Sequence, residues 1–310
     1  MNLLRRLWGP LTRGRTGVIA LPYLWLLVFF LLPFLILAKI SVSEMELVTF
    51  KDVLTYSDGV LTLALKFGNY LFIGQDALYF SAYVRSVQYA ATTTLLCLFI
   101  GYPFAYFMAR AKSTTQPLLL MLVMLPFWTS FLLRVYSWKG LLTDGGWVWN
   151  VFTATGIDLW LYQMGLIAAP GKLMNTSFSL VLGMTYTYLP FMILPLYSNL
   201  SKMDTRLLEA AADLGATPWT AFWKITVPLS KAGIIAGSML VFIPCIGEYV
   251  IPELLGGPET QMIGRVIWDE FFSNNDWPMA SAVAVVMILL IIVPLAAFNK
   301  YQAEAQEKAR

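Results

Sequence analysis

The stretch EAAADLGATPWTAFWKITVP, residues 209–228, lies between two long apolar runs of the chain. It carries charges and a central Gly215, and its hydrophobic residues are too scattered to span a bilayer. An ordinary connecting loop would need only a few polar residues, whereas this stretch has the pattern of folded helices. The apolar runs on either side of it decide the fold class, and the function depends on what the stretch itself contacts.

The composition is that of a membrane protein. The 310 residues are 58% hydrophobic and 13% charged, about half of the roughly 25% charged share of a globular protein. The net charge of +3 is spread along the chain, so no basic patch predicts a nucleic-acid partner. The chain has no histidine, and Cys97 and Cys245 lie in apolar runs that suit buried thiols. We therefore expect neither a catalytic site nor a metal site nor a cofactor in this chain.

Apolar runs of about 20 residues predict transmembrane helices, because about 30 Å of hydrocarbon must be crossed at 1.5 Å per residue. The sequence predicts an all-α, polytopic membrane protein whose transmembrane domain covers residues 17–299. Its six predicted spans are Gly17–Ile40, Val84–Ala109, Leu118–Trp138, Thr176–Leu200, Ala232–Leu254 and Met279–Asn299.

The distribution of Lys and Arg predicts the orientation, since these residues are retained on the cytoplasmic side. Most of them fall in the segment 1–16, in the loops at residues 110–112 and 201–231, and in the tail 300–310. Both termini are therefore expected in the cytoplasm. A cleavable signal peptide is the alternative for the amino terminus, but its apolar run exceeds the usual 7 to 15 residues. The opposite loops, 41–83 and 139–175, could pack as short helices or be solvated connections.

The stretch 209–228 and the residues before it read as a helix, a tight turn and a second helix. Ser201 and Asp204 could cap the first helix, and Gly215 is suited to end it in a left-handed conformation. Thr217 can cap the second helix with Pro218 at its first position, and Pro228 is expected to close it. Apolar side chains lie on one face of each helix: Leu207, Leu208, Ala211 and Leu214, then Trp219, Phe222 and Ile225.

Two interpretations of these apolar faces remain open at this point. They could pack on the inner ends of the chain's own spans, or they could dock into a groove on a soluble partner. Both need the same helical pattern, so the pattern alone does not separate them.

The spacing of the stretch resembles the EAA signature of permease subunits in binding-protein-dependent ABC importers. The resemblance is carried by Glu209, Ala210, Ala211, Gly215, Ile225, Val227 and Pro228, with Val227 standing where leucine is usual. In that family the motif forms a coupling helix that inserts into a cytoplasmic ATPase. The resemblance therefore implies a coupling segment at residues 201–228. Its implied ATPase contacts are Glu209, Ala210, Ala211, Asp213, Gly215, Ala216 and Pro218.

A wider resemblance covers nearly the whole chain. The stretches LPYLWLLVFFLLPFLILAKIS, LPFWTSFLLRVYSW, GSMLVFIPCIGEYVIPELLGG, MIGRVIWDEFF and DWPMASAVA are similar to putrescine and spermidine permeases, closest to the putrescine type. This resemblance implies a bacterial inner-membrane heterodimer with a second permease, two copies of an ATPase and a periplasmic polyamine-binding protein. ATP and Mg would be bound by the ATPase, since no Gly-Lys-Ser/Thr phosphate loop occurs here.

A pathway for a polyamine needs carboxylates to replace water around its ammonium groups and aromatic faces to hold charge and methylenes. Glu248 lies inside an apolar run, where an ionisable residue is a functional-site candidate. Tyr249 and Glu253 follow it, while Pro244, Gly247 and Pro252 interrupt regular helix. Further candidates for the substrate pathway are Trp138, Tyr188 and Asp269.

Each pathway candidate also has a structural alternative. Counted along straight helices, Arg134 and Glu248 lie at similar depth and could form a buried ion pair without touching substrate. Trp138 and Tyr188 could belong to an interfacial belt or to helix packing, and Asp269 could be a solvated loop charge.

The sequence leads to a permease subunit that forms half of a translocation pore for a polyamine, with putrescine expected. The same class of importer with another cargo, such as sulfate, iron or thiamine, is the alternative. Two other classes are an intramembrane enzyme, with Glu248 and Glu253 as acid and base, and an ATP-independent carrier.

Overall fold

The computed structural model describes residues 15–46, 49–50, 54–57, 60–63 and 65–308. The predicted amino-terminal segment 1–16 therefore lies outside the described residues except for its last two, and the tail 300–310 lacks its last two. The described chain forms two compact units, 1–76 with 267–286 and 77–266 with 287–310. Each is described by itself.

The first unit begins with a long apolar helix that contains a wide turn. Helix α2 (Arg15–Leu26) runs into the π turn η1 (Leu27–Leu31) and on into α3 (Leu32–Ser41). Residues Val18–Ser41 are long and apolar enough to cross a membrane, which agrees with the predicted span Gly17–Ile40.

The predicted loop 41–83 is partly β-structure, which the sequence did not predict. Strands β1 (Met45–Glu46) and β2 (Thr49–Phe50) form one antiparallel pair, and β3 (Leu54–Ser57) and β4 (Val60–Leu63) form another. Helix α4 (Gly68–Gln75) follows, and the hydroxyl of Tyr70 lies 2.7 Å from that of Ser41 at the end of α3. These hairpins are small additions to an all-helical membrane fold.

The rest of the first unit comes from near the carboxyl terminus. Helix α16 (Ile263–Trp268) ends here and continues as the π turn η5 (Asp269–Ser273). The long helix α17 (Trp277–Lys308) starts here and ends in the second unit. The backbone N–H of Met279 donates to Asp276 Oδ1 at 2.9 Å, which satisfies a donor that the first turn of a helix leaves free.

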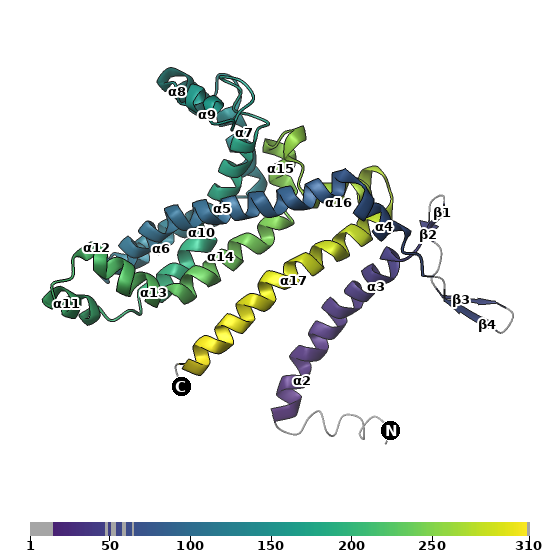
Figure 1. The fold of residues 1–310 in the computed structure, drawn as a ribbon, viewed down its shortest axis with the longest axis horizontal. Helices are drawn as coiled ribbons and strands as arrows, with labels where there is room; N and C mark the ends of the chain where they lie inside the picture. Colours follow the sequence, from purple (N-terminus) through teal and green to yellow (C-terminus); the bar gives the residue numbers. More distant parts are fainter. Residues whose placement is uncertain (1–14, 47–48, 51–53, 58–59, 64, 309–310) are drawn as a thin grey trace. The chain divides into compact units, whose positions relative to one another are not determined.

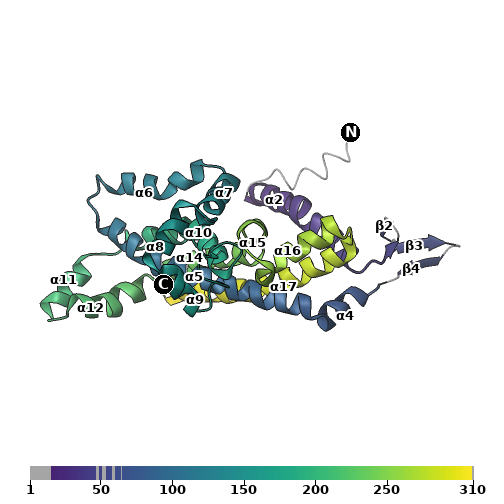
Figure 2. The same ribbon diagram turned by 90° about the horizontal axis from the view of Figure 1, so that it is seen from above.

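The second unit is built around three helices, α5 (Ala77–Arg110), α10 (Ser177–Leu200) and α14 (Lys231–Ile246), which pack against one another. Figures 1 and 2 show them running side by side. The remaining elements of this unit are α6 (Gln116–Met124), η2 (Leu125–Trp128), α7 (Phe131–Leu142), α8 (Trp147–Thr155), α9 (Ile157–Gln163), α11 (Arg206–Asp213), α12 (Pro218–Ala221), η3 (Phe222–Thr226), α13 (Val227–Leu229), α15 (Val250–Leu255) and η4 (Pro258–Thr260).

Two glycines let α14 approach α10 closely. A Cβ at Gly233 would lie 2.8 Å from Asn199 Cβ, and one at Gly237 would lie 2.8 Å from Met192 Sδ and 3.1 Å from its carbonyl oxygen. Small residues four positions apart are the usual device for close helix packing in membranes, where backbones must approach without a hydrophobic driving force. This pair fixes α14 against the middle of α10.

Replacing Gly237 with Leu is expected to destabilise the bundle, because the added side chain meets the backbone of Met192 as well as its flexible end. Overpacking of this kind costs about 1–3 kcal/mol. We expect a lower melting temperature of the purified chain in detergent. Gly68→Leu is the matched control, since nothing lies within 4 Å of a Cβ there. Equal melting temperatures for the two variants would contradict the close-packing account.

Two of the predicted spans are broken rather than straight. The run Leu118–Trp138 divides into α6 with η2 and α7 because Thr129 and Ser130 are extended (ψ 151° and 136°), and its two parts meet at 86°. The run Ala232–Leu254 divides between α14, which ends at Ile246, and α15, which begins at Val250. The straight helix expected for Leu118–Trp138 was therefore wrong, whereas the interruption expected at Gly247 is confirmed, since Gly247 follows the last residue of α14.

Among the described residues, four helices are long and apolar enough to cross a membrane, and two bent pairs bring the number to six if each pair is one span. The four are Val18–Ser41, Ala77–Arg110, Ser177–Leu200 and Trp277–Ala296; the pairs are Gln116–Trp128 with Phe131–Thr155, and Pro218–Leu229 with Lys231–Ile246. The all-helical polytopic class is confirmed.

The predicted loop 139–175 is folded, as the short-helix alternative proposed. Helices α8 and α9 stand beside α7 to one side of the three-helix bundle (Figure 1). Their core is held by Trp149, whose indole N–H donates to Gly171 O at 2.7 Å. The buried residues of this small cluster are Leu142, Leu161, Ile167 and Leu173.

Candidate functional site

The first candidate site centres on the carboxylate of Glu248, which lies at the break between α14 and α15. Its Oε2 accepts a hydrogen bond of 2.5 Å from the hydroxyl of Tyr188 on α10. Tyr188 is 8% exposed, whereas Glu248 is partly exposed. An ionisable side chain at a helix break is thus bonded to a phenol of a neighbouring membrane helix.

The other oxygen of Glu248 organises the backbone. Its Oε1 accepts from the N–H of Val250 at 3.0 Å and from that of Ile251 at 3.5 Å, which are the first two N–H groups of α15. A carboxylate at a helix amino terminus satisfies free donors and complements the helix dipole. The same side chain therefore shapes the break and presents an oxygen toward Tyr188.

Neighbouring elements hold the break in place. The hydroxyl of Ser179 on α10 donates to the carbonyl of Leu255 at 2.7 Å, which ties the end of α15 to the start of α10. A Cβ at Gly264 would lie 2.4 Å from the carbonyl oxygen of Gly247, so α16 begins in direct backbone contact with the break. The geometry around Glu248 is thus set by α10, α15 and α16 together.

A row of aromatic rings leads from Tyr188 to Arg134. The centroids of Tyr188 and Phe191 are 6.1 Å apart, and those of Phe191 and Phe127 are 5.1 Å apart in a T-shaped arrangement. The guanidinium carbon of Arg134 lies 5.6 Å from the centroid of Phe127. Aromatic faces at such distances attract cations, so this row could accommodate an ammonium group.

The predicted alternative of an ion pair between Arg134 and Glu248 is not found among the salt bridges of the described residues. The depth argument assumed two straight helices, whereas both runs break before these residues align. Two nitrogens of Arg134, Nε and Nη1, are buried without a hydrogen-bond partner in the described part of the chain. Its contacts are instead with the rings of Phe127 and Phe131.

Glu253 is paired, and its partner was missed from the sequence. The side chain of Glu253 is 50% exposed, and its Oε2 lies 2.8 Å from Nε of Arg265 on α16. Arg265 stands 12 positions further along the chain, so no local spacing rule connects the two residues. Tyr249, next to Glu248, is the residue before α15 and is partly exposed.

No contact between Trp138 and Glu248 is found among the described residues. Trp138 packs edge-on to Tyr186 at 5.5 Å between centroids and borders the cluster under α8 and α9. Asp269 belongs to the first unit, where it begins the π turn η5. Of the predicted pathway residues, Tyr188 donates a hydrogen bond to Glu248.

The second candidate site is the coupling segment, residues 201–228, at the end of the bundle opposite α15 (Figure 1). The predicted cap by Ser201 and Asp204 is not formed, because α11 begins at Arg206 with Thr205 as its capping residue and no side-chain cap bond. Asp204 Oδ1 instead accepts from the backbone N–H of Arg206 at 3.0 Å. Gly215 has φ of +81° and ends α11 as predicted. The N–H of Ala216 donates to Ala211 O and that of Gly215 to Ala212 O, both at 2.9 Å. These two bonds are those of a Schellman motif.

The second helix of the segment begins as predicted but ends later. The Thr217 hydroxyl accepts from the N–H of Thr220 at 3.2 Å, and Pro218 occupies the first turn. The helical path then continues through η3 and α13 to Leu229, past the expected end at Pro228. Pro228 is tolerated because it follows the π turn and occupies an early position of α13.

The self-packing interpretation is confirmed for part of the apolar faces, whereas docking into a partner stays a prediction for the side chains left exposed. Ala211 is buried and Phe222 packs on the rings of Tyr102 and Tyr106 of α5. Leu214, by contrast, is 89% exposed and Trp219 is 71% exposed. Of the remaining predicted contacts, Ala216 is partly exposed, and Glu209, Ala210, Asp213, Gly215 and Pro218 are exposed.

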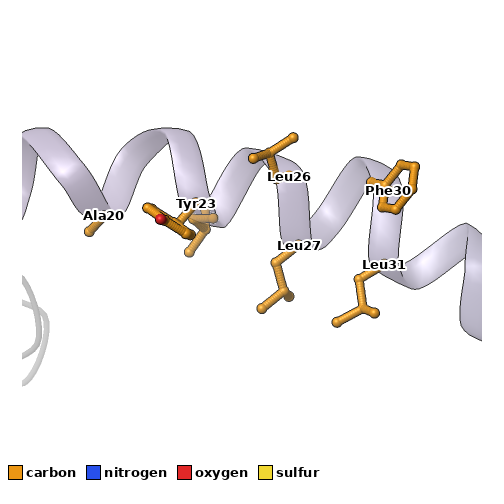
Figure 3. A pocket seen from close by; sticks show the side chains of 7 residues that line it. Ala20, Tyr23, Leu26, Leu27, Phe30 and Leu31 are labelled. Atoms are coloured by element: carbon orange, nitrogen blue, oxygen red, sulfur yellow. The ribbon is translucent and has the colours of Figure 1, made fainter. Parts of the chain in front are cut away.

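Two hollows lie elsewhere on the chain. Figure 3 shows one along α2 and η1, where Tyr23, Leu27 and Phe30 are among its lining residues; it has no charged side chain that could hold an ionic cargo. The other, about 290 Å³, lies between residues 165–177 and η4 and includes Lys172 and Glu259. Neither hollow includes Glu248.

A family model for the binding-protein-dependent transport system inner membrane component matches residues 16–305. The chain belongs to this family. Membership in it favours a permease of a transport system over the intramembrane enzyme and the ATP-independent carrier.

Individual relatives of this inner membrane component align with most of the chain. A spermidine/putrescine transport system permease protein of Haemophilus influenzae is 37% identical over 279 residues, 89% of this chain and 91% of the relative. The one from Escherichia coli K12 is 37% identical over 267 residues, 86% of this chain and 90% of the relative. A bacterial ABC transporter involved in alginate import shares the fold, with a TM-score of 0.61 and 17% identity over 97% of this chain and 98% of that one.

Proposed function

We propose that this inner membrane component is a permease subunit of an ABC importer that carries a polyamine, with putrescine as the expected cargo. It would form half of a translocation pore, with both termini in the cytoplasm. The observation that carries the cargo assignment is the Tyr188–Glu248 pair beside a row of aromatic rings. Support also comes from the two relatives at 37% identity, both spermidine/putrescine permeases.

The chemistry of the pair suits an organic dication. A carboxylate replaces the water that an ammonium group loses inside the membrane, and ring faces hold both charge and methylenes. The alternative cargo sulfate is disfavoured, because Glu248 would repel an anion at close range. A longer polyamine such as spermidine uses the same chemistry, so the cargo must be decided by competition.

The coupling segment supports the proposal that a partner ATPase binds ATP and that this chain contacts the partner. Leu214 and Trp219 are large apolar side chains left exposed, and neither α11 nor α12 is long enough by itself to cross a membrane. Burying such residues against a protein groove is the ordinary use of an amphipathic helix. The occupied groove would belong to an ATPase dimer that binds ATP and Mg, and a second permease and a periplasmic polyamine-binding protein would complete the complex.

The test is co-purification followed by transport. The chain, expressed with its neighbouring transport subunits, should co-elute in mild detergent with an ATPase and a second permease. Proteoliposomes of that complex with the binding protein should take up labelled putrescine only with ATP. An excess of unlabelled putrescine should compete more strongly than spermidine, sulfate, iron or thiamine. Uptake without ATP, or competition by sulfate alone, would reject the proposal.

A further inference from the structure

Phe222 of the coupling segment is wedged against two rings of α5. Its ring centroid lies 5.6 Å from that of Tyr102 and 5.9 Å from that of Tyr106, and both contacts are edge-on, at 88° and 87°. Edge-to-face pairs of this geometry are favourable beyond simple burial. The side chain therefore joins the coupling segment to a membrane-spanning helix at two points one turn apart.

The place where Phe222 touches α5 is a weak point of that helix. Pro103 stands inside α5, between Tyr102 and Tyr106. A proline inside a helix removes a backbone hydrogen bond and allows a bend. A movement of Phe222 against Tyr102 and Tyr106 would therefore act on α5 beside Pro103, where that helix bends most easily.

Phe222 also begins an irregular turn of its own segment. The π turn η3 starts at this residue, and the Thr226 hydroxyl within it is buried without a hydrogen-bond partner in the described part of the chain. Such turns interrupt regular helix and often occur at functional positions. The coupling segment can therefore change its angle at the residue that contacts α5.

Tyr102 connects the same contact to the following span. Its hydroxyl and that of Ser230, the residue before α14, are 2.8 Å apart and buried. Tyr102 thus touches the coupling segment through its ring and the start of α14 through its hydroxyl.

On the far side, α5 lies directly on α10. A Cβ at Gly101 would be 3.2 Å from side-chain atoms of both Met192 and Ile193. Met192 is four positions from Tyr188, so the two share one face of α10, and Tyr188 bonds Glu248. Contacts therefore lead from Phe222 through Tyr102 and the adjacent Gly101 to Met192, which lies one helical turn from Tyr188 of the candidate cargo site.

We propose that Phe222 is the positioning residue that transmits movement of the coupling segment to α5 and, through α10, to the Tyr188–Glu248 pair. This inference rests on the proposed function, because it needs a partner ATPase to move the segment. In this proposal, Trp219 and Leu214 contact the partner ATPase, whereas Phe222 contacts the membrane helices. A transmitting residue should alter coupling without altering assembly.

The test compares Phe222→Ala with Phe222→Tyr in the complete complex. In Phe222→Ala, ATP hydrolysis and co-purification of the ATPase should stay within twofold of the wild-type values, while polyamine uptake per ATP falls at least fivefold. Phe222→Tyr keeps the ring and should retain most of the uptake per ATP. If Phe222→Ala does not fold, Phe222→Leu replaces it, since leucine keeps the apolar volume and loses the ring edges.

Phe104→Ala is the matched control, because Phe104 lies on the same stretch of α5 and is 56% exposed. It should leave uptake per ATP unchanged. Tyr106→Leu should lower it, and combining Tyr106→Leu with Phe222→Ala should give little further loss, since Phe222→Ala already removes the contact with Tyr106.

Three results would overturn the inference: unchanged uptake per ATP in Phe222→Ala, loss of the ATPase from that complex, or equal failure of Phe222→Tyr. Failure of the proposed function looks different, because the wild-type complex itself would then lack ATP-driven polyamine uptake. The two failures are therefore distinguishable.

Discussion

Gly215→Asp is expected to lower ATP-driven uptake by at least tenfold while the chain still folds and inserts. Nothing lies within 4 Å of a Cβ built at Gly215, so the chain itself has room for the new side chain. The φ of +81° adds strain of about 1–2 kcal/mol for a residue other than glycine, although Asp and Asn tolerate it best. The larger effect comes from a buried, unpaired carboxylate at the surface that is proposed to dock into the ATPase.

Gly215→Asn separates charge from strain, because it has nearly the same shape and backbone preference as Asp. We expect Asn to retain most of the uptake and of the ATPase co-purification that Asp loses. Uptake by Gly215→Asp at the wild-type rate would count against docking at this turn. Equal loss in Asp and Asn would point to the Schellman conformation rather than to charge as the requirement.

Glu248→Gln is expected to reduce uptake at limiting substrate by at least tenfold, equivalent to about 1.4 kcal/mol or more of lost stabilisation. Gln keeps an oxygen that can accept from the N–H of Val250, so the start of α15 should survive. It loses the charge that would balance an ammonium group in the membrane. The measurement is initial uptake of labelled putrescine by reconstituted complex.

Two matched variants sharpen this experiment. Glu253→Gln removes a carboxylate that is half exposed and already paired with Arg265, and it should change uptake less than threefold. Tyr188→Phe removes the hydroxyl that bonds Glu248 and keeps the ring, so an intermediate loss is expected. If Glu248→Gln and Glu253→Gln behaved alike, the two acids would not differ in role and the candidate site would be wrong.

Features set by local sequence could be predicted, and the coupling segment illustrates this. Gly215 in the left-handed region and Thr217 as a helix cap depend on a few neighbouring residues, and both are confirmed. The single-helix spans Val18–Ser41 and Ser177–Leu200 agree with their predicted bounds to within one residue at each end, because membrane thickness fixes their length.

Features that depend on breaks and distant contacts could not be predicted. The run Leu118–Trp138 was read through Thr129 and Ser130 as one helix, so the 86° bend that moves Arg134 out of line with Glu248 was missed. The Tyr188–Glu248 and Arg265–Glu253 pairs join residues 60 and 12 positions apart, and no periodicity specifies either one. The π turn at Phe222 carried no composition signal, although its contacts with α5 support the further inference.

The short range of the hydrogen bonds in the coupling segment bears on how the protein is made. These bonds join residues at most five positions apart. They run from Arg206 N to Asp204, from Ala216 N to Ala211 and from Thr220 N to Thr217. The helix that Phe222 packs on, α5, precedes the segment in the chain. None of these bonds needs a residue of α14 or α17, so they can form during synthesis, with α5 already made as a packing surface, before those later helices exist. A soluble partner could then recognise a chain that is still being translated.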